Sequence, residues 1–313
     1  MNSKTGYVFQ EEYVRHELSY GHPESPERLK AVKKKMRETG LDKDVHFIDP
    51  LDDKEEVLEA LSLVHSQEHT HSVLEHNTTG DIAFLAAAGV LGAVKKVMDG
   101  MLTNAFCAVR PPGHHAHNNG IHCDGRYQGE GFCFFNNAAI GARYAQKKYG
   151  CKSVLILDWD YHHGNGTEWA FYSDPSVFFF STHILFGYPG TGYPDKTGSK
   201  TGSGYNLNIP LPPYAEDSHI INAWEKELIP ALKKLNFKPD LIIISAGFDS
   251  REGDILGNFR ITDKGFSKLT EIAMELAQTH CSGKLVSVLE GGYNPEGLAN
   301  GVFYHIKTLL NSK

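Results

Sequence analysis

The sequence has few cysteines, no excess of positive charge and no long hydrophobic run. Five cysteines occur among 313 residues, and no two form a C-x-x-C pair, which excludes a disulfide framework and predicts reduced thiols in the core. Lysine and arginine number 31 against 38 aspartates and glutamates, for a formal net charge of -7. That balance argues against a nucleic-acid-binding surface and leaves a cationic substrate or partner open.

Membrane association is not expected from the sequence. The longest apolar stretch, residues 82–94, is too short to cross a bilayer. The first residues, MNSKTGYVFQEEYVRHE, carry charges where a signal peptide needs an apolar run. We therefore expect a cytoplasmic location, while the oligomeric state, monomer or homo-oligomer, stays open.

Short apolar runs alternate with longer helical patterns along the whole chain, which is typical of an α/β protein with a mostly parallel sheet covered by helices on both faces. Strands are predicted at residues 106–109, 154–157, 177–180, 241–244 and 285–289. Helices are predicted at residues 26–36, 82–98, 134–149, 217–235 and 262–278. Residues 187–204 and 210–214 are predicted as loops. No linker divides the sequence, so we expect residues 1–313 to form a single domain.

Each of the five predicted strands ends in a polar cluster. The clusters are RPPGHH, DWDYHH, STH, SAGFD and EGGYN, in chain order. Ligand sites of parallel sheets form outside the carboxyl ends of the strands. We therefore expect these five tails to meet at one crevice.

The stretch LILDWDYHHGNG carries the strongest metal signal. Alternation along an extended segment places Asp158, Asp160 and His162 on one side, and buried carboxylates need a cation or strong donors beside them. Asp249 in SAGFDS is a candidate third ligand with Asp160 and His162, although an aspartate there could also cap a turn. Two carboxylates and one imidazole would leave positions open for water and substrate, with zinc and ferrous iron both fitting.

Two adjacent histidines are candidate proton acceptors. His114 and His115 follow a Pro-Pro-Gly turn, and Asp158 and Asn165 are their candidate partners. A carboxylate partner raises the pKa of a histidine and a neutral amide does not, so the two pKa values should differ. Tyr293, after two glycines, is a candidate hydrogen-bond donor to a polarised carbonyl, although a plain core tyrosine fits the pattern as well.

Five motifs together resemble the histone deacetylase and acetylpolyamine amidohydrolase family. They are RPPGHHA (110–116), GFCFFNNAA (131–139), DWDYHHGNGT (158–167), SAGFDS (245–250) and EGGYN (290–294), and HPESPERL (22–29) matches the first loop. In having an asparagine at position 165, the sequence resembles the class II and bacterial branch of the family. The resemblance implies an arginase-like α/β fold of about eight strands and zinc-dependent hydrolysis of an acetylated amine.

The resemblance also implies a role for each matching residue. Asp160, His162 and Asp249 would bind one zinc ion, and His115 would act as general base and then acid. His114, paired with Asp158, would give electrostatic support, Asn165 would orient His115, and Tyr293 would stabilise the oxyanion of the tetrahedral intermediate.

Potassium sites and substrate contacts are likewise implied by the resemblance. One structural potassium site would fall on Asp158, Asp160, His162, Ser181 and Thr182. A second would fall on Phe171, Asp174, Val177 and Tyr205. The acyl-lysine channel would be lined by Gly131, Phe132, Tyr188 and Leu256, and Arg28 would lie near an internal acetate cavity.

Two positions bear on the substrate. Leu256 stands where polyamine-selective relatives place a glutamate, which favours an acylated lysine over an acetylpolyamine. The fourteen residues 117–130 replace about half a dozen in the family and should lie beside the channel. Partners would be an acylated lysine peptide or protein, or a small acylated amine.

Three alternatives stay open at this point. An acetylpolyamine deacetylase would share the chemistry and differ at the channel mouth. A binuclear manganese ureohydrolase should show a D-x-D pair where SAGFDS offers only Asp249. A non-catalytic module that binds acylated ligands should have lost Tyr293 or a metal ligand.

Overall fold

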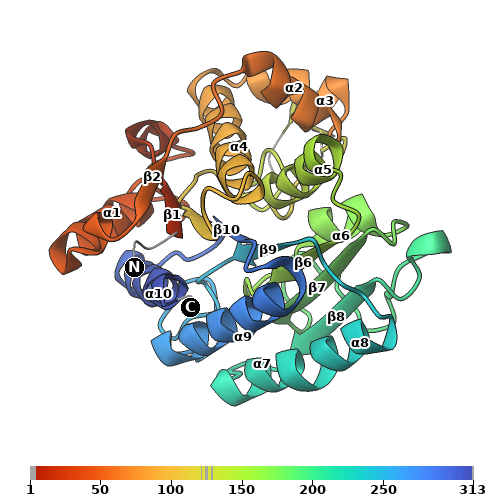
Figure 1. Cartoon of the computed structure of the whole chain (residues 1–313). Coiled ribbons are helices and arrows are strands. Elements are labelled where there is room, and N and C mark those ends of the chain that lie inside the picture. Colours follow the sequence, from red (N-terminus) through yellow and green to blue (C-terminus); the bar gives the residue numbers. More distant parts are fainter. Residues whose placement is uncertain (1–4, 121, 124–125, 128–129, 312–313) are drawn as a thin grey trace.

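Apolar runs rich in β-branched and aromatic residues form the central strands, as their burial on both faces requires. The computed structural model describes residues 5–120, 122–123, 126–127 and 130–311. Eight parallel strands form one sheet in the order β2-β1-β3-β10-β9-β6-β7-β8 (Figure 1). Their bounds are β1 Thr5–Val8, β2 His46–Ile48, β3 Asn104–Cys107, β6 Val154–Asp158, β7 Val177–Ile184, β8 Asn206–Leu211, β9 Leu241–Ala246 and β10 Leu285–Leu289.

Helices cover both faces of the sheet (Figure 1). On one face α4 packs against β1, β3 and β10, and α5 packs against α4 and β9. On the other face lie α9 and α10, with α1 packed against α10 and α7 against β8. The bounds are α1 Glu27–Thr39, α2 Lys54–Ser62, α3 Gln67–Leu74, α4 Asn77–Met98, α5 Asn137–Tyr149, α6 Asn165–Phe171, α7 Asp217–Ala223, α8 Ile229–Lys234, α9 Asp263–Cys281 and α10 Pro295–Leu310.

The order of the strands creates a crevice above the middle of the sheet. The chain builds β1, β2 and β3 on one side and β6, β7 and β8 on the other, and β9 and β10 then fill the gap between β3 and β6. The connections from the neighbouring strands β9 and β6 therefore leave in opposite directions, β9 toward β10 and β6 toward β7, which is the arrangement that opens a ligand site at the carboxyl ends of the strands. The tails of β3, β6, β9 and β10 surround this point.

The predicted fold class is confirmed, with corrections to individual elements. All five predicted strands exist, but β3 begins two residues earlier than predicted and β7 extends to Ile184. The strands β1, β2 and β8 were missed; β2 and β8 are the edges of the sheet, and β8 includes Pro210, which was predicted as loop. An edge strand accommodates proline because one side of its backbone has no partner strand. The predicted helix 217–235 is α7 and α8 joined by a π-helical turn, Trp224–Leu228.

The insertion 117–130 begins and ends beside the crevice. At its base, the Glu130 carboxylate accepts hydrogen bonds from the His117 backbone N–H at 2.9 Å and from His117 Nδ1 at 2.6 Å. Between these ends, β4 (His122–Cys123) pairs antiparallel with β5 (Arg126–Tyr127). Gly131 and Phe132, which directly follow the insertion, line the cavity described below.

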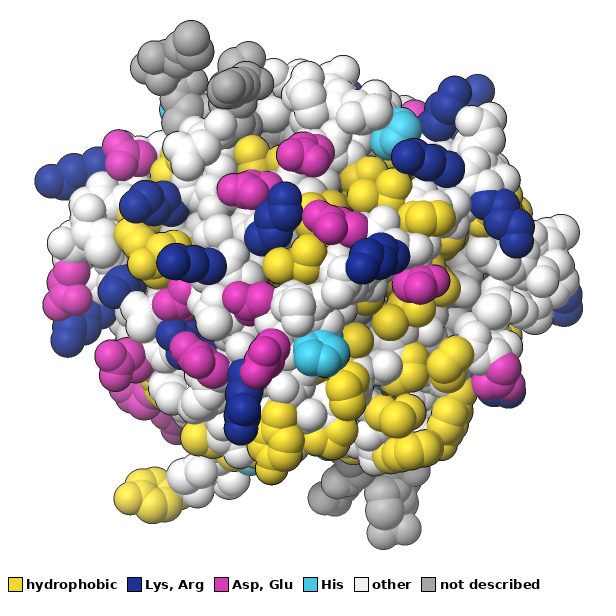
Figure 2. Space-filling view, turned by 90° about the horizontal axis from the view of Figure 1, so that it is seen from below, with side chains coloured by type: hydrophobic (Ala, Val, Ile, Leu, Met, Phe, Trp, Pro, Cys, Tyr) yellow, Lys and Arg dark blue, Asp and Glu magenta, His cyan; other side chains and the backbone are white. Residues whose placement is uncertain are grey.

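Acidic and basic side chains are interspersed on the face shown in Figure 2, and hydrophobic side chains gather toward its lower right. The cysteines with described side chains, Cys107, Cys133, Cys151 and Cys281, are buried, which agrees with the prediction of core cysteines. Within the described part of the chain, no helix is both long and apolar enough to cross a membrane.

Candidate active site

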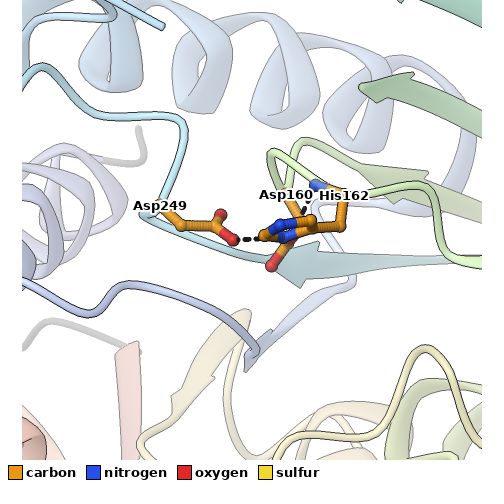
Figure 3. A group of neighbouring side chains, drawn as sticks. All are labelled: Asp160, His162 and Asp249. Atoms are coloured by element: carbon orange, nitrogen blue, oxygen red, sulfur yellow. Dashed lines mark hydrogen bonds and ion pairs between the residues drawn. The ribbon is translucent and has the colours of Figure 1, made fainter. Parts of the chain in front are cut away.

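Asp160, His162 and Asp249 meet at the carboxyl ends of two neighbouring strands. Asp160 and His162 follow β6, Asp249 follows β9, and these strands pair in register from Val154 with Leu241 to Asp158 with Ser245. The possible ligand atoms of the three residues lie within 4.8 Å of one another. His162 Nδ1 is 2.8 Å from Asp249 Oδ2 and 3.3 Å from Asp160 Oδ1 (Figure 3). The predicted ligand set is thus brought together.

Backbone groups hold both carboxylates in place. Asp160 Oδ2 accepts a hydrogen bond from the Gly291 N–H at 2.8 Å, and Asp249 Oδ1 accepts one from the Tyr161 N–H at 2.9 Å. A side chain at Gly291 would collide with the Asp249 carboxylate, so glycine is required for this close approach. The tail of β10 therefore helps to orient ligand candidates from β6 and β9.

The charges of these three groups favour a bound cation. Burial, followed by the charge of Asp160, raises the pKa of Asp249 to about 7. Burial opposes protonation of His162, but its bonds to Asp160 and Asp249 outweigh this and raise its pKa to about 10. Two buried carboxylates are thus balanced by a single imidazole, which leaves excess negative charge away from water. The oxygen, oxygen and nitrogen donor set fits zinc.

The adjacent histidines have the two partners predicted for them. His114 Nδ1 lies 3.0 Å from Asp158 Oδ2, and His115 Nδ1 lies 2.7 Å from Asn165 Oδ1. The two rings are 4.0 Å apart between centroids. Because the Asn165 oxygen accepts, the hydrogen of a neutral His115 belongs on Nδ1, and Nε2 is free to accept a proton.

The pKa values of the two histidines differ, as predicted, and they move in opposite directions. Burial disfavours the charged form of His114, but the charges of Asp160 and Asp158 outweigh it and raise the pKa of His114 well above its ordinary value. Burial and the neighbouring charges of His114 and His162 hold the pKa of His115 well below its ordinary value. His115 is therefore the neutral base of the pair.

Tyr293 reaches the same crevice from the tail of β10. Its ring contacts Phe132 edge to face at 5.8 Å, and the Arg28 guanidinium carbon lies 5.1 Å from the ring centroid. Burial raises the pKa of Tyr293 well above its ordinary value, so the phenol keeps its hydrogen and can donate it. Asn294 then caps α10 by accepting from the Gly297 N–H at 3.1 Å.

A cavity of about 590 Å³ connects these groups to the surface. All four predicted channel residues line it, together with His115, His162 and Tyr293. The Tyr188 ring contacts those of His115 at 5.1 Å and His162 at 6.1 Å. Three further lining residues were missed from the sequence. The complete lining is Leu18, His22, His115, Gly131, Phe132, Phe134, His162, Tyr188, Leu256 and Tyr293.

Arg28 belongs to a buried ionic network behind Tyr293. Its Nη1 donates to Glu24 Oε1 at 2.8 Å, and Arg110 Nη2 donates to Glu24 Oε2 at 2.7 Å. Burial opposes ionisation of Glu24, but hydrogen bonds from Arg110 and His16 outweigh it and hold the pKa of Glu24 well below its ordinary value. The network ties the first loop to the loop bearing the two histidines. Glu24 was missed from the sequence, although it lies within the motif HPESPERL.

The residues assigned to potassium lie in two places. At the ends of β6 and β7, Asp158 pairs in register with Ser181, and Thr182 Oγ1 donates to the Asp158 carbonyl at 3.4 Å. The second set lies in a turn between α6 and β7, where the Asp174 N–H donates to the Phe171 carbonyl at 3.0 Å and the Val177 N–H to the Asp174 carbonyl at 3.5 Å. Tyr205 lies beside β7, accepting from the Phe179 N–H.

A family model described as a histone deacetylase domain matches residues 22–309. This chain belongs to the histone deacetylase family. Membership confirms the resemblance drawn from the motifs, and it makes the protein a hydrolase of the deacetylase class.

Known members of the histone deacetylase family match nearly the whole chain. A probable deacetylase of Archaeoglobus fulgidus is 39% identical over 307 residues, covering 94% of this chain and 82% of the relative. Histone deacetylase 5 of Arabidopsis thaliana is 34% identical over 345 residues, covering 99% of this chain and 49% of the relative. This chain thus spans about half the length of that plant relative.

The crystal structure of the HDA15 HD domain has the same fold. It matches with a TM-score of 0.88 at 33% sequence identity and covers 100% of this chain and 89% of that chain. The eight-stranded sheet described above is therefore the histone deacetylase fold.

Proposed function

We propose that this protein is a zinc-dependent amidohydrolase that removes acetyl or short acyl groups from acylated lysine or a related amine. One observation carries the proposal: the ligand candidate His162, the base candidate His115 and the donor candidate Tyr293 line the same cavity. These are the parts that amide hydrolysis needs, namely an electrophile, a base and an oxyanion donor.

Asp160, His162 and Asp249 would hold the zinc ion. When bound, zinc would polarise the acyl carbonyl and make water more acidic. His115 would take the proton of the attacking water at Nε2, because Asn165 fixes its hydrogen on Nδ1. The Tyr293 phenol would donate a hydrogen bond to the oxyanion. His115 would then deliver its proton to the departing amine.

The surroundings of His114 suit a supporting role. Its charge, kept by Asp158, would offset the negative charge that grows on the acyl group, and would also discourage protonation of His115. We further propose structural potassium ions at the two sites named above, because carbonyl and hydroxyl oxygens are the donors available at both. An acetate cavity beside Arg28 belongs to the same proposal.

The channel mouth favours acylated lysine over an acetylpolyamine. Leu256 lines the mouth with its side chain 40% exposed, and an apolar residue offers no partner for a second ammonium. Asp254, two residues away, already accepts four backbone hydrogen bonds. The carboxylate nearest Leu256 in sequence is thus engaged within the protein.

The remaining alternatives are less well supported. Among the described residues, the group of three or more metal-binding side chains is Asp160, His162 and Asp249, whereas a binuclear ureohydrolase would need a second group. A non-catalytic module would have no need of a buried phenol and a neutral histidine facing the same cavity. We further propose that residues 1–313 act as one deacetylase domain in the cytoplasm.

Turnover of two substrates tests the proposed activity. A fluorogenic acetyl-lysine peptide and N-acetylputrescine are compared with zinc restored, and again with a chelator present. We expect hydrolysis of the peptide, loss of activity with the chelator, and a fall in kcat of about 10²- to 10³-fold in Tyr293→Phe, the loss typical of an oxyanion donor. Turnover of neither substrate would refute the deacetylase proposal, and turnover of the polyamine alone would refute the substrate assignment.

A further inference from the structure

Asp254 is a carboxylate whose two oxygens hold two different segments of the chain. Oδ1 accepts the backbone N–H groups of Leu256 at 2.9 Å and Gly257 at 3.2 Å. Oδ2 accepts those of Tyr293 at 2.7 Å and Asn294 at 3.0 Å. The side chain therefore joins its own loop after β9 to the loop after β10.

Both segments contribute walls of the cavity. Leu256 lies at the mouth, and Tyr293 lies beside the catalytic groups. Asn294 strengthens the junction, since its Nδ2 donates to the Gly253 carbonyl at 2.9 Å. A shift of one loop against the other would thus change the position of the phenol relative to the channel.

Hydrogen bonds from three side chains hold the backbone around Tyr293. Arg28 donates to the Glu290 carbonyl at 2.5 Å and to the Gly292 carbonyl at 2.6 Å. Asp160 accepts the Gly291 N–H, and Asp254 accepts the N–H groups of Tyr293 and Asn294. Of these three, only Asp254 holds the N–H of Tyr293 itself.

The two glycines before Tyr293 make this restraint necessary. Gly292 adopts φ +121°, a conformation open to glycine and disfavoured for other residues, and Gly291 also lacks a side chain. The phenol is therefore attached to a flexible Gly-Gly segment on one side and to the capped start of α10 on the other. Without Asp254, the backbone of Tyr293 would be restrained mainly by Arg28, which donates hydrogen bonds to the preceding carbonyl groups.

We propose that Asp254 is a positioning residue that fixes the Tyr293 phenol at the reacting carbonyl by bridging the loops after β9 and β10. The role deepens the proposed function and rests on it. Only an ionised carboxylate offers acceptors on both sides of the junction, because an asparagine would turn its donor group toward one pair of N–H groups. The negative charge also strengthens all four hydrogen bonds.

Asp254→Ala and Asp254→Asn test the bridge, with Asp240→Ala as the control matched to the alanine variant. Asp240 Oδ2 accepts the N–H groups of Lys152 at 2.7 Å and Ser153 at 3.0 Å, the same distances that Asp254 Oδ2 makes. Asp240 precedes β9 and so lies at the opposite end of the strands from the site. The asparagine variant retains the shape of the side chain, and it replaces the alanine variant if that one does not fold.

Amide hydrogen exchange gives a readout that needs no activity. We expect the Tyr293 and Asn294 amides to exchange at least about tenfold faster in Asp254→Ala, and only the Lys152 and Ser153 amides to do so in Asp240→Ala. Unchanged exchange at Tyr293 and Asn294 would overturn the proposal. Faster exchange in a protein that hydrolyses no acetyl-lysine peptide would support the bridge and refute the proposed function.

A double-mutant cycle with Tyr293→Phe separates positioning from general damage. We expect Asp254→Ala to lower kcat about 10- to 100-fold, the scale of a small misplacement, with KM changed less than about threefold. In the Tyr293→Phe background the same change should cost less than about threefold, because the phenol is already absent. Equal losses in both backgrounds would show that Asp254 acts by general stability and would overturn the positioning role.

Discussion

His114 and His115 are neighbours in sequence, yet they meet different partners and acquire opposite properties. His114 faces the Asp158 carboxylate, which helps to raise its pKa, and His115 faces the neutral Asn165 amide, with its pKa lowered by burial and by His114. Both side chains are buried to nearly the same extent. The comparison shows that the surrounding charges decide which histidine holds a proton: the carboxylates Asp160 and Asp158 favour a charged His114, and the neighbouring histidines disfavour a charged His115.

We expect the largest difference in kcat/KM between the variants His115→Ala and His114→Ala. We expect His115→Ala to lower kcat/KM about 10²- to 10⁴-fold, the contribution of a general base. His114→Ala should lower it less, by about 10- to 100-fold, because His114 supports charge without accepting the proton of the attacking water. Steady-state kinetics on the acetyl-lysine peptide, with equal bound zinc verified for each variant, checks this order. A greater loss in His114→Ala would reverse the assignment.

Asp158→Asn should weaken the charged pair. An amide would donate to His114 Nδ1 and so favour the neutral ring, with its hydrogen moved to Nε2. We expect kcat to fall about 10- to 100-fold, as for other residues that orient groups beside a metal. Kinetics, together with histidine NMR of the same variant, checks the cause. An unchanged kcat with a neutral His114 would show that its charge is not needed.

Asn165→Asp should make the pair of His115 and residue 165 resemble the charged pair of His114 and Asp158. A carboxylate beside His115 Nδ1 stabilises the imidazolium and raises the pKa of His115. Since the base works only above its pKa, the acid limb of the pH profile of kcat/KM should move to higher pH by about one unit. The plateau at high pH should change less than about tenfold. A shift of the acid limb to lower pH would contradict this account.

Glu290 holds the backbone at His114, and we expect its replacement to disturb the contrast between the two histidines least. Its Oε2 accepts the N–H groups of Gly113 at 2.6 Å and His114 at 3.1 Å. Burial raises its pKa to about 7, above an unfolded value of about 4.3. The folded state thus binds a proton more tightly, so this contribution to stability is complete below the unfolded pKa and is lost as pH rises through about 7.

Glu290→Gln should therefore gain relative stability with rising pH. At pH 8 we expect its free energy of unfolding to exceed that of the wild type by at most about 4 kcal/mol, with the difference vanishing near pH 4. Urea unfolding at both pH values, without zinc, measures it. A stability difference that stays constant with pH would show that the carboxyl group titrates alike in the folded and unfolded states.

The central fold and most of the site could be predicted from the sequence, because both depend on buried strands and on the polar residues that directly follow those strands. Val154–Asp158 (VLILD) and Leu285–Leu289 (LVSVL) are mostly apolar and fully buried, and their tails carry Asp160, His162 and Tyr293. Edge strands lack this signal. β2 has three residues with two exposed, and β8 reads NLNIPL, so polar and proline residues concealed them.

Residues that depend on loop placement were harder to predict. Leu18 lines the cavity only because the N-terminal loop folds over it, and nothing in its own neighbourhood marks it. Glu24 becomes important only when Arg28 and Arg110 converge on it from distant parts of the chain. Both depend on long-range packing, which local pattern and spacing do not encode.

The order in which the strands enter the sheet has a consequence for synthesis on the ribosome. β9 and β10 lie between β3 and β6, so a nascent chain that has reached residue 240 holds two groups of strands without their common centre. Each group presents an unpaired inner edge, which is prone to pairing with other chains. Because Asp249 and Tyr293 arrive with the strands that close this gap, we expect metal affinity to appear only when the sheet is complete, and zinc binding can therefore report the end of folding.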